Sequence, residues 1–280
     1  MTITYAWKSV EEIKQRMEPS FWVVPDVSDE LAQSGFPVSP LGQFIAYMKQ
    51  GDVPRKGRGE KYEDVGITFI EVISIIPTGI DFETAKYISR KQHTRLAKSR
   101  PRPRDVLLVR SGKGSIGKVA IVSDEMPEEM NISGHINLIR VEGINPYYVA
   151  TVLKSSFGQV QIERLSSGVS RQVNIGFAKI RSIHIPVLPK SIQLRVEERY
   201  KQMSRFHHAA MEAKAAGNEA EHKEKLAYAE QLLDELITYV EKTIRARPQA
   251  LKVEASTSRR KSFGGFMSLD RTGQQSDCVA

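Results

Sequence analysis

The chain has 280 residues, of which 40% are hydrophobic and 26% are charged, and its formal net charge is +8. The length is sufficient for one large or two modest domains with a sizeable core. A single cysteine, Cys278, excludes a disulfide within the chain. No apolar run approaches the ~20 residues that span a bilayer, and no signal-peptide core is present near the N-terminus. The sequence therefore predicts a soluble cytoplasmic protein.

Short β-branched runs separated by glycine and proline characterise residues 1–189, which predicts a globular α+β domain with a mixed or antiparallel curved sheet. We expect strands within 66–72, 105–110, 118–122, 136–141 and 183–187. A helix is expected over Pro146–Leu153, because proline is favoured in the first helical turn.

A glycine-rich stretch, Gly112 to Lys118, has nearly the spacing of a phosphate-binding P-loop. A P-loop needs Ser or Thr directly after the lysine and a helix after that. Here Val119 follows the lysine, and 119–122 reads as a strand. We therefore interpret the stretch as the basic tip of a β-hairpin, and a nucleotide hydrolase as a rival hypothesis only.

Positive charge is concentrated between Arg90 and Lys118, where ten lysines and arginines stand against one acid, Asp105. A basic chain suits an acidic partner, of which nucleic acid is the usual one. The alternative is a basic surface that is merely solvated. The concentration of charge in one stretch favours a binding patch.

Residues 190–247 differ in composition, because glycine and proline nearly vanish and apolar residues recur at steps of three and four. This pattern predicts either one long coiled-coil-like helix or a helical hairpin that turns near Gly217. The apolar stripe favours a partner helix, although packing against the chain's own globule stays open. Residues 248–280 are rich in Ser, Arg, Gly and Gln and predict a disordered tail.

Catalytic and metal-binding patterns are absent from the sequence. The histidines lack zinc-ligand spacing, and one cysteine cannot complete a cysteine-rich site. No methyltransferase or nuclease motif is visible, so we expect no cofactor and no enzymatic activity.

Several blocks of the chain resemble, in order, the target recognition domain of DNA specificity subunits from type I restriction–modification systems. Residues 16–22 are similar to the family's N-terminal signature, and the resemblance covers roughly residues 11–245. The later blocks are 67–70, 78–81, 86–89, 104–112, 117–122, 146–148, 165–168, 173–175 and 183–189.

The resemblance implies a non-catalytic subunit that reads duplex DNA. It also implies docking to an adenine-N6 methyltransferase that uses S-adenosylmethionine, and in some systems to a restriction subunit. Typical members carry two recognition domains, whereas this chain has one, as a half-length form would. Two arrangements stay open: a homodimer through residues 190–247, or a simpler system with one recognition domain.

DNA binding needs phosphate contacts for affinity and base-edge contacts for sequence specificity. Arginine reads guanine, and glutamine or asparagine reads adenine; Asn174 alternatively caps a helix that starts near residue 175. Arg100, Arg102 and Arg104 alternate with prolines, so we expect them extended and on the DNA backbone. The candidate DNA-binding residues are Arg55, Lys56, Arg58, Lys61, Arg100, Arg102, Arg104, Arg110, Ser111, Lys113, Ser115, Lys118, Arg171, Gln172 and Asn174. The alternative function is a stand-alone basic scaffold that binds nucleic acid or protein.

Overall fold

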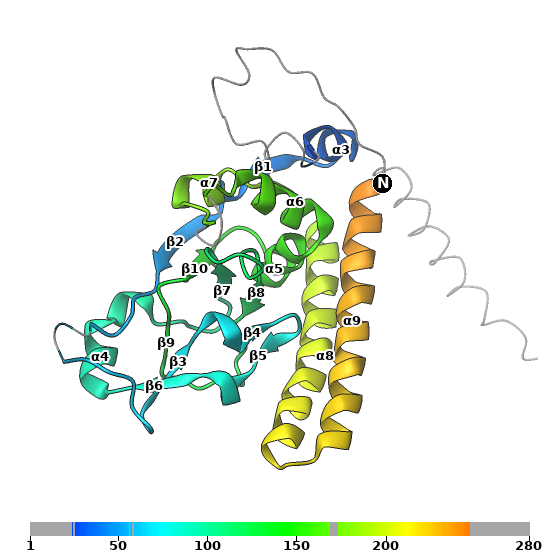
Figure 1. Cartoon of the computed structure of the whole chain (residues 1–280). Coiled ribbons are helices and arrows are strands. Elements are labelled where there is room, and N and C mark those ends of the chain that lie inside the picture. Colours follow the sequence, from blue (N-terminus) through cyan, green and yellow to red (C-terminus); the bar gives the residue numbers. More distant parts are fainter. Residues whose placement is uncertain (1–23, 25, 56, 58, 169–172, 247–280) are drawn as a thin grey trace, which may run out of the picture.

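The computed structural model of the chain describes residues 24, 26–55, 57, 59–168 and 173–246 (Figure 1). The expected N-terminal signature, the expected tail, Lys56, Arg58, Arg171 and Gln172 lie outside this part. The strands are β1 Val38–Pro40, β2 Ile45–Gln50, β3 Ile67–Ile70, β4 Ile75–Ile76, β5 Gly79–Ile80, β6 Lys86–Ile88, β7 Val106–Val109, β8 Val119–Ile121, β9 Met130–Ile132, β10 Ile136–Val141 and β11 His184–Pro186. The α-helices are α3 Ser28–Gln33, α4 Arg90–Arg95, α5 Pro146–Lys154, α6 Ser156–Leu165, α7 Phe177–Arg181, α8 Lys190–Ala215 and α9 Glu219–Arg245.

A four-stranded antiparallel sheet in the order β2-β10-β7-β8 forms the centre of the globule. Strand β7 is apolar at every position because both of its faces are covered. Val106 and Leu108 belong to the core on the helical side, whereas Leu107 and Val109 belong to a second core. Burial on both faces explains why this strand shows no apolar–polar alternation.

Smaller sheets complete the second core. Strand β3 pairs antiparallel with β6 and parallel with β9, and β4 pairs with β5 in a tight hairpin. Residues Ile70, Ile75 and Ile80 from these strands are fully buried against the central sheet. The expected α+β class with mixed and antiparallel sheets is thus confirmed.

The expected helix at Pro146 is confirmed as α5. The Asn145 side chain accepts hydrogen bonds from the amides of Tyr147 at 2.9 Å and Tyr148 at 3.3 Å. Proline follows the capping residue at the first helical position, where its missing N–H is not needed. This cap fixes the start of a helix that is buried along most of its length.

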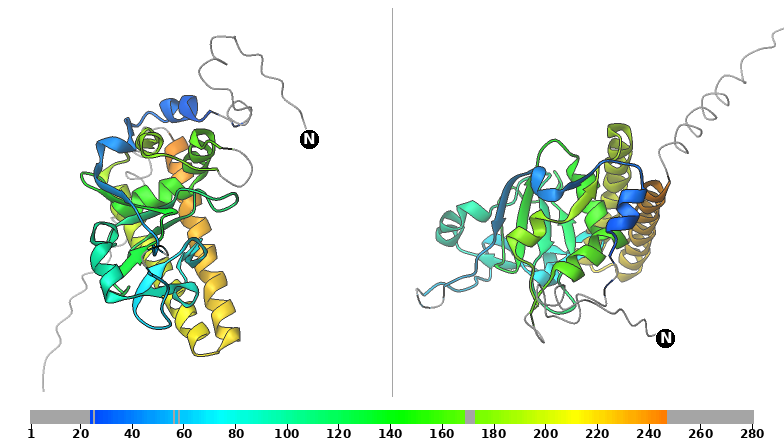
Figure 2. Two further views of the ribbon diagram at one scale, coloured as in Figure 1. Left: turned by 60° about the vertical axis from the view of Figure 1, so that its left-hand side comes forward. Right: turned by 90° about the horizontal axis from the view of Figure 1, so that it is seen from above.

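Residues 190–245 form a helical hairpin and not a rod: α8 and α9 run antiparallel beside each other (Figures 1 and 2). The turn is a Schellman-type C-terminus, in which the Asn218 amide donates to the Ala213 carbonyl at 2.8 Å. Gly217 takes a φ of 74°, which is unstrained only for glycine. The Asn218 side chain then caps α9 by accepting from the Glu221 amide.

The apolar stripe of the hairpin is buried within the chain itself. On α8, Val196 and Tyr200 are at most 1% exposed, and on α9 Leu236 and Val240 are equally covered. All four belong to the core that also contains β7 and α5. Each such burial contributes about 1.5–3 kcal/mol. Of the two alternatives, packing within the chain is the one observed, since α8, α9 and the globule cover the stripe.

A buried histidine on α8 forms hydrogen bonds with the β4–β5 hairpin. His207, 1% exposed, lies with Nδ1 2.9 Å from the Thr78 hydroxyl and Nε2 3.1 Å from the Ile80 carbonyl oxygen. A neutral ring satisfies both contacts, accepting from Thr78 and donating to Ile80. Gly79 permits this approach, because a Cβ there would lie 2.6 Å from the ring. Burial lowers the pKa of His207 to about 4.

Lowering the pH should weaken the hydrogen bonds of His207 with this hairpin. A histidine whose pKa falls from 6.5 to about 4 on folding binds more protons when unfolded, so its contribution is full above pH 6.5 and is lost as pH falls towards 4. We expect the free energy of unfolding to drop by about 2 kcal/mol between pH 7.5 and pH 5 through this group. His207→Gln should lower stability at pH 7.5 and flatten the pH dependence, as measured by urea denaturation. The control His184→Gln, at an exposed position, should keep the wild-type pH dependence; an unchanged slope in His207→Gln would assign the acid sensitivity elsewhere.

Candidate nucleic-acid interface

Loops from distant parts of the sequence leave the central sheet at one edge. Strand β2 ends at Gln50, β7 ends at Val109, and β10 begins at Ile136. The register pairs Gln50 with Asn137 and Val109 with Ile136, so these three strand ends lie side by side. The segments 51–62, 110–118 and 133–135 therefore begin next to one another. They then diverge, because the 110–118 tip lies against α9 whereas 51–62 lies away from the helical hairpin. Two of them carry most of the predicted DNA-binding residues.

Main-chain hydrogen bonds join the hairpin tip to the segment that contains Asn174. The Gly112 amide donates to the Val173 carbonyl at 3.1 Å, and the Ile175 amide donates to the Arg110 carbonyl at 2.9 Å. Asn174 forms backbone bridges with Ser111 and Ser167. Helix α7 begins only at Phe177, so the alternative role of Asn174 as a helix cap is wrong. Its exposed side chain lies beside the tip.

The hairpin interpretation of the glycine-rich stretch is confirmed, because β7 and β8 pair antiparallel on either side of it. Gly112, Gly114 and Gly117 have φ values of 109°, 75° and 88°, which only glycine adopts without strain. Four tip amides, at residues 115 to 118, donate to carbonyls of the tip and of β7. These amides are consequently unavailable to a phosphate, so the glycines serve the turn.

Side chains of the tip have different environments. Lys113 is exposed, whereas Lys118 is partly buried and lines a cleft next to α9. The Ser111 hydroxyl lies 2.7 Å from Nδ1 of the exposed His135. Ser115 is partly buried. Lys113 is the tip cation best placed to meet a phosphate.

Segment 51–62 is held by Arg95 of α4, a residue that sequence reasoning did not select. The guanidinium of Arg95 lies 2.8 Å from an Asp52 carboxylate oxygen and 2.6 Å from one of Glu60. A hydrogen bond from the Arg55 amide, together with that from Arg95, holds the pKa of Glu60 below its usual value. Arg55 and Lys61 remain exposed on the segment, and Arg55 also lies 3.4 Å from an Asp52 carboxylate oxygen. With α4, this segment lies on the side of the molecule away from the helical hairpin (Figures 1 and 2).

The expectation that the three arginines between prolines stay extended and available is corrected for two of them. Arg104 has a φ of 73° and pairs with both carboxylate oxygens of Glu197 on α8, at 2.7 and 3.3 Å. Arg100 donates twice to the His93 carbonyl at the end of α4. Both side chains thus connect elements within the chain. Arg102 is exposed.

Buried polar side chains without a hydrogen-bond partner gather near the same sheet edge. Among the described residues they include both amide atoms of Asn137, the Ser133 hydroxyl and Nε of Arg110. Such groups are uncommon in folded proteins and call for an explanation. Asn137 is fully buried between apolar residues of β10. A polar residue inside an apolar strand run is the sequence signal that could have pointed to this cluster, and sequence reasoning did not select it. These buried donors and acceptors are therefore free to form hydrogen bonds beneath the exposed loops.

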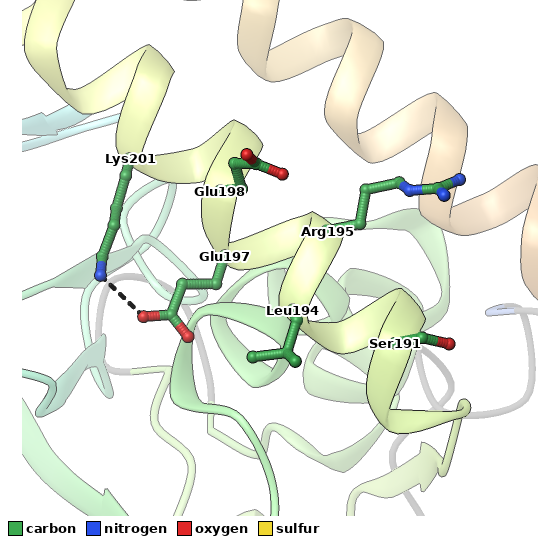
Figure 3. Close-up of a pocket in the computed structure, with 6 residues that line it drawn as sticks. All are labelled: Ser191, Leu194, Arg195, Glu197, Glu198 and Lys201. Atoms are coloured by element: carbon green, nitrogen blue, oxygen red, sulfur yellow. Dashed lines mark ion pairs between the residues drawn. The ribbon is translucent and has the colours of Figure 1, made fainter.

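A second surface lies on the outer side of α8, where a shallow depression surrounds Leu194 (Figure 3). Leu194 is 54% exposed, whereas the other large apolar residues of α8 are buried or partly buried. Glu197 beside it pairs with Lys201 at 2.8 Å as well as with Arg104. Those contacts, the hydrogen bond from Arg104 foremost, lower the pKa of Glu197 to about 2. The depression thus presents one apolar side chain, Leu194, surrounded by charged side chains, of which Glu197 is held in place by ion pairs.

Neither a metal centre nor a membrane span is found in the described ranges. No group of three or more His, Cys, Asp or Glu residues there could hold a metal ion. None of the described helices is long and apolar enough to cross a bilayer.

No protein-family model and no curated protein matches the chain. Among solved structures, it is similar to the S subunit of a type I restriction–modification system from M. genitalium (14% identity, TM-score 0.43, covering 64% of this chain and 41% of that one). It is also similar to the HsdS subunit of Thermoanaerobacter tengcongensis (15% identity, TM-score 0.40, covering 84% of this chain and 51% of that one). A third similar structure is the type IIG restriction endonuclease BpuSI (12% identity, TM-score 0.46, covering 86% of this chain and 36% of that one).

The S subunits belong to the family that the sequence blocks resemble. The chain spans between about a third and a half of the length of these three structures.

Removing the Arg95 anchor should loosen segment 51–62. In Arg95→Met, Asp52 and Glu60 lose their shared cation, so we expect faster amide hydrogen exchange across the segment and a loss of about 1–3 kcal/mol in stability. Arg90→Met is the matched control on the same helix, because its partner Glu129 is an exposed carboxylate. Equal exchange rates in both variants would show that the segment is held by other contacts.

Proposed function

We propose that the chain is a sequence-specific DNA-recognition subunit of a type I-like restriction–modification system and has no catalytic activity of its own. The observation that carries the proposal is that the candidate DNA-binding loops start from neighbouring strand ends of the central sheet. Segments 51–62 and 110–118 leave these strand ends, and the segment around Asn174 is tied to 110–118 by main-chain hydrogen bonds. The family resemblance of the sequence blocks supports the same function.

The residues divide into two roles within this proposal. Exposed cations at the rim, Lys61 and Lys113, neutralise phosphates and set the orientation of the duplex, and Arg55 joins them by exchanging Asp52 for a phosphate. Asn174, together with Arg171 and Gln172, reads base edges in a groove, since amide and guanidinium groups match adenine and guanine. His135 joins them through its contact with Ser111.

Docking to a modification methyltransferase is the second part of the proposal, and a restriction subunit joins in systems that possess one. The outer side of α8 offers an exposed apolar side chain, Leu194, among charged residues of both signs. An apolar centre with a polar rim is the usual composition of a protein–protein interface. A homodimer, if formed, would use such an outer surface, because the apolar stripe between the helices is already covered.

Phosphate contacts should appear in the salt dependence of DNA binding. We expect duplex affinity to fall steeply with salt, and Lys113→Gln to weaken all sequences alike while reducing the slope of log K against log [salt] by about 1. Fluorescence anisotropy with a random-sequence duplex measures both quantities. The control Lys223→Gln, exposed on α9 near its turn, should match the wild type. Salt-independent binding, or stronger binding to duplex RNA, would favour a different basic scaffold.

Base readers should behave differently from phosphate contacts. After selection of the preferred sequence from a random duplex library, we expect Asn174→Ala or Gln172→Ala to cost about 1–3 kcal/mol at one base position and to relax specificity there. Repeating the selection with each variant identifies the position. A uniform loss for all sequences would assign these side chains to the backbone.

The docking surface is tested by charge insertion. Leu194→Glu should weaken the complex with the co-expressed methyltransferase by at least about tenfold, since it places a charge in an apolar contact. DNA binding by the isolated subunit should be unchanged. Val65→Glu is the control, because Val65 is 85% exposed on the globule. Light scattering and calorimetry measure the complex; wild-type behaviour of Leu194→Glu would locate docking elsewhere.

A further inference from the structure

A cleft of about 400 Å³ lies between the hairpin tip and α9. Its walls come from four parts of the chain: the tip, the β4–β5 hairpin, the α5–α6 region and α9. Most of the wall is aliphatic, with Ile76, Ile116 and Ile237 contributing from three different elements. Two lysines, Lys118 and Lys154, line the same cleft.

Lys154, the last residue of α5, has no acidic partner in the part of the chain that the structure describes. Its ammonium donates to the Pro77 carbonyl at 2.6 Å and to the Val119 carbonyl. An ammonium group has three donors, so these two contacts leave one. No carboxylate of the described residues forms an ion pair with it; Asp234 lines the cleft but forms none. Burial lowers the pKa of Lys154 to about 7, as expected for a cation without a counter-charge.

This arrangement defines the chemistry of an occupant. A carboxylate would supply the missing charge and accept the remaining ammonium donor. Aliphatic groups beside it would contact the isoleucine walls. A DNA phosphate fits poorly, because it is strongly hydrated and brings no apolar group into the cleft.

We propose that this cleft binds a partner protein through one carboxylate side chain that stands next to a large aliphatic side chain. The volume suits two side chains, and the cleft opens where the globule meets α9, so a protein that contacts both would pass over it. The site shares Gly114, Ile116, Gly117 and Lys118 with the hairpin tip of the proposed DNA interface, but its carboxylate chemistry does not depend on DNA recognition.

The test uses the full chain labelled at isoleucine δ1 methyl groups and the capped peptide acetyl-Leu-Asp-Leu-amide. We expect saturable methyl shifts confined to Ile76, Ile116 and Ile237, and at least about tenfold weaker binding of the matched Asn peptide, because a charge-assisted hydrogen bond is lost. Binding should also take up protons at pH 7.5, as calorimetry in two buffers detects, since the carboxylate stabilises the charged form of Lys154.

Two variants identify the site. Lys154→Met should abolish the preference for the Asp peptide, and Ile237→Trp should block both peptides by filling the cleft while leaving Lys154 in place; the other isoleucine methyls report folding. Lys223→Met is the control and should bind as the wild type. Equal binding of the Asp and Asn peptides, or no saturable shift at all, would overturn the proposal. Tighter binding of free 4-methylpentanoate than of the peptide would also overturn it, by indicating a small-molecule site.

Discussion

The structure depends on one apolar core that the globule and the helical hairpin share. Strand β7 and helix α5 contribute to it from the globule, and α8 and α9 contribute Tyr200 and Leu236. Since the hairpin completes the cover on one face of the central sheet, the orientation of the sheet relative to α8 and α9 is fixed by burial. The sheet-edge loops, the outer side of α8 and the cleft beside α9 all take their places from this packing.

Much of the positive charge in the sequence balances acids that lie far away along the chain. Arg95 meets Asp52 and Glu60, and Arg104 meets Glu197. A run of cations between 90 and 118 is therefore not a continuous basic surface. Only those side chains whose neighbours in space are not acidic remain for a polyanion, and Lys113 is the clearest of them within the tip.

The sequence predicted the parts of the fold whose signals are local. The strand runs, the helix start at Pro146 and the hairpin tip follow from short patterns of β-branched, proline and glycine residues, and all are present. The position of the helical stripe could not be predicted, because periodicity shows that a face is buried but not what covers it. For the same reason Arg95, Lys154 and His207 were missed as fixed groups, since each acquires its environment from segments distant in sequence.

The loops at the sheet edge are joined mainly through their peptide groups. The contacts of Gly112 with Val173 and of Arg110 with Ile175 involve only amide and carbonyl atoms. Lys113 or Asn174 can therefore be substituted by any residue that tolerates the local φ and ψ without loss of these main-chain hydrogen bonds. Side-chain identity on this surface is thus free to diverge while the scaffold is retained, and relatives with one architecture could acquire different binding preferences through a few exchanges.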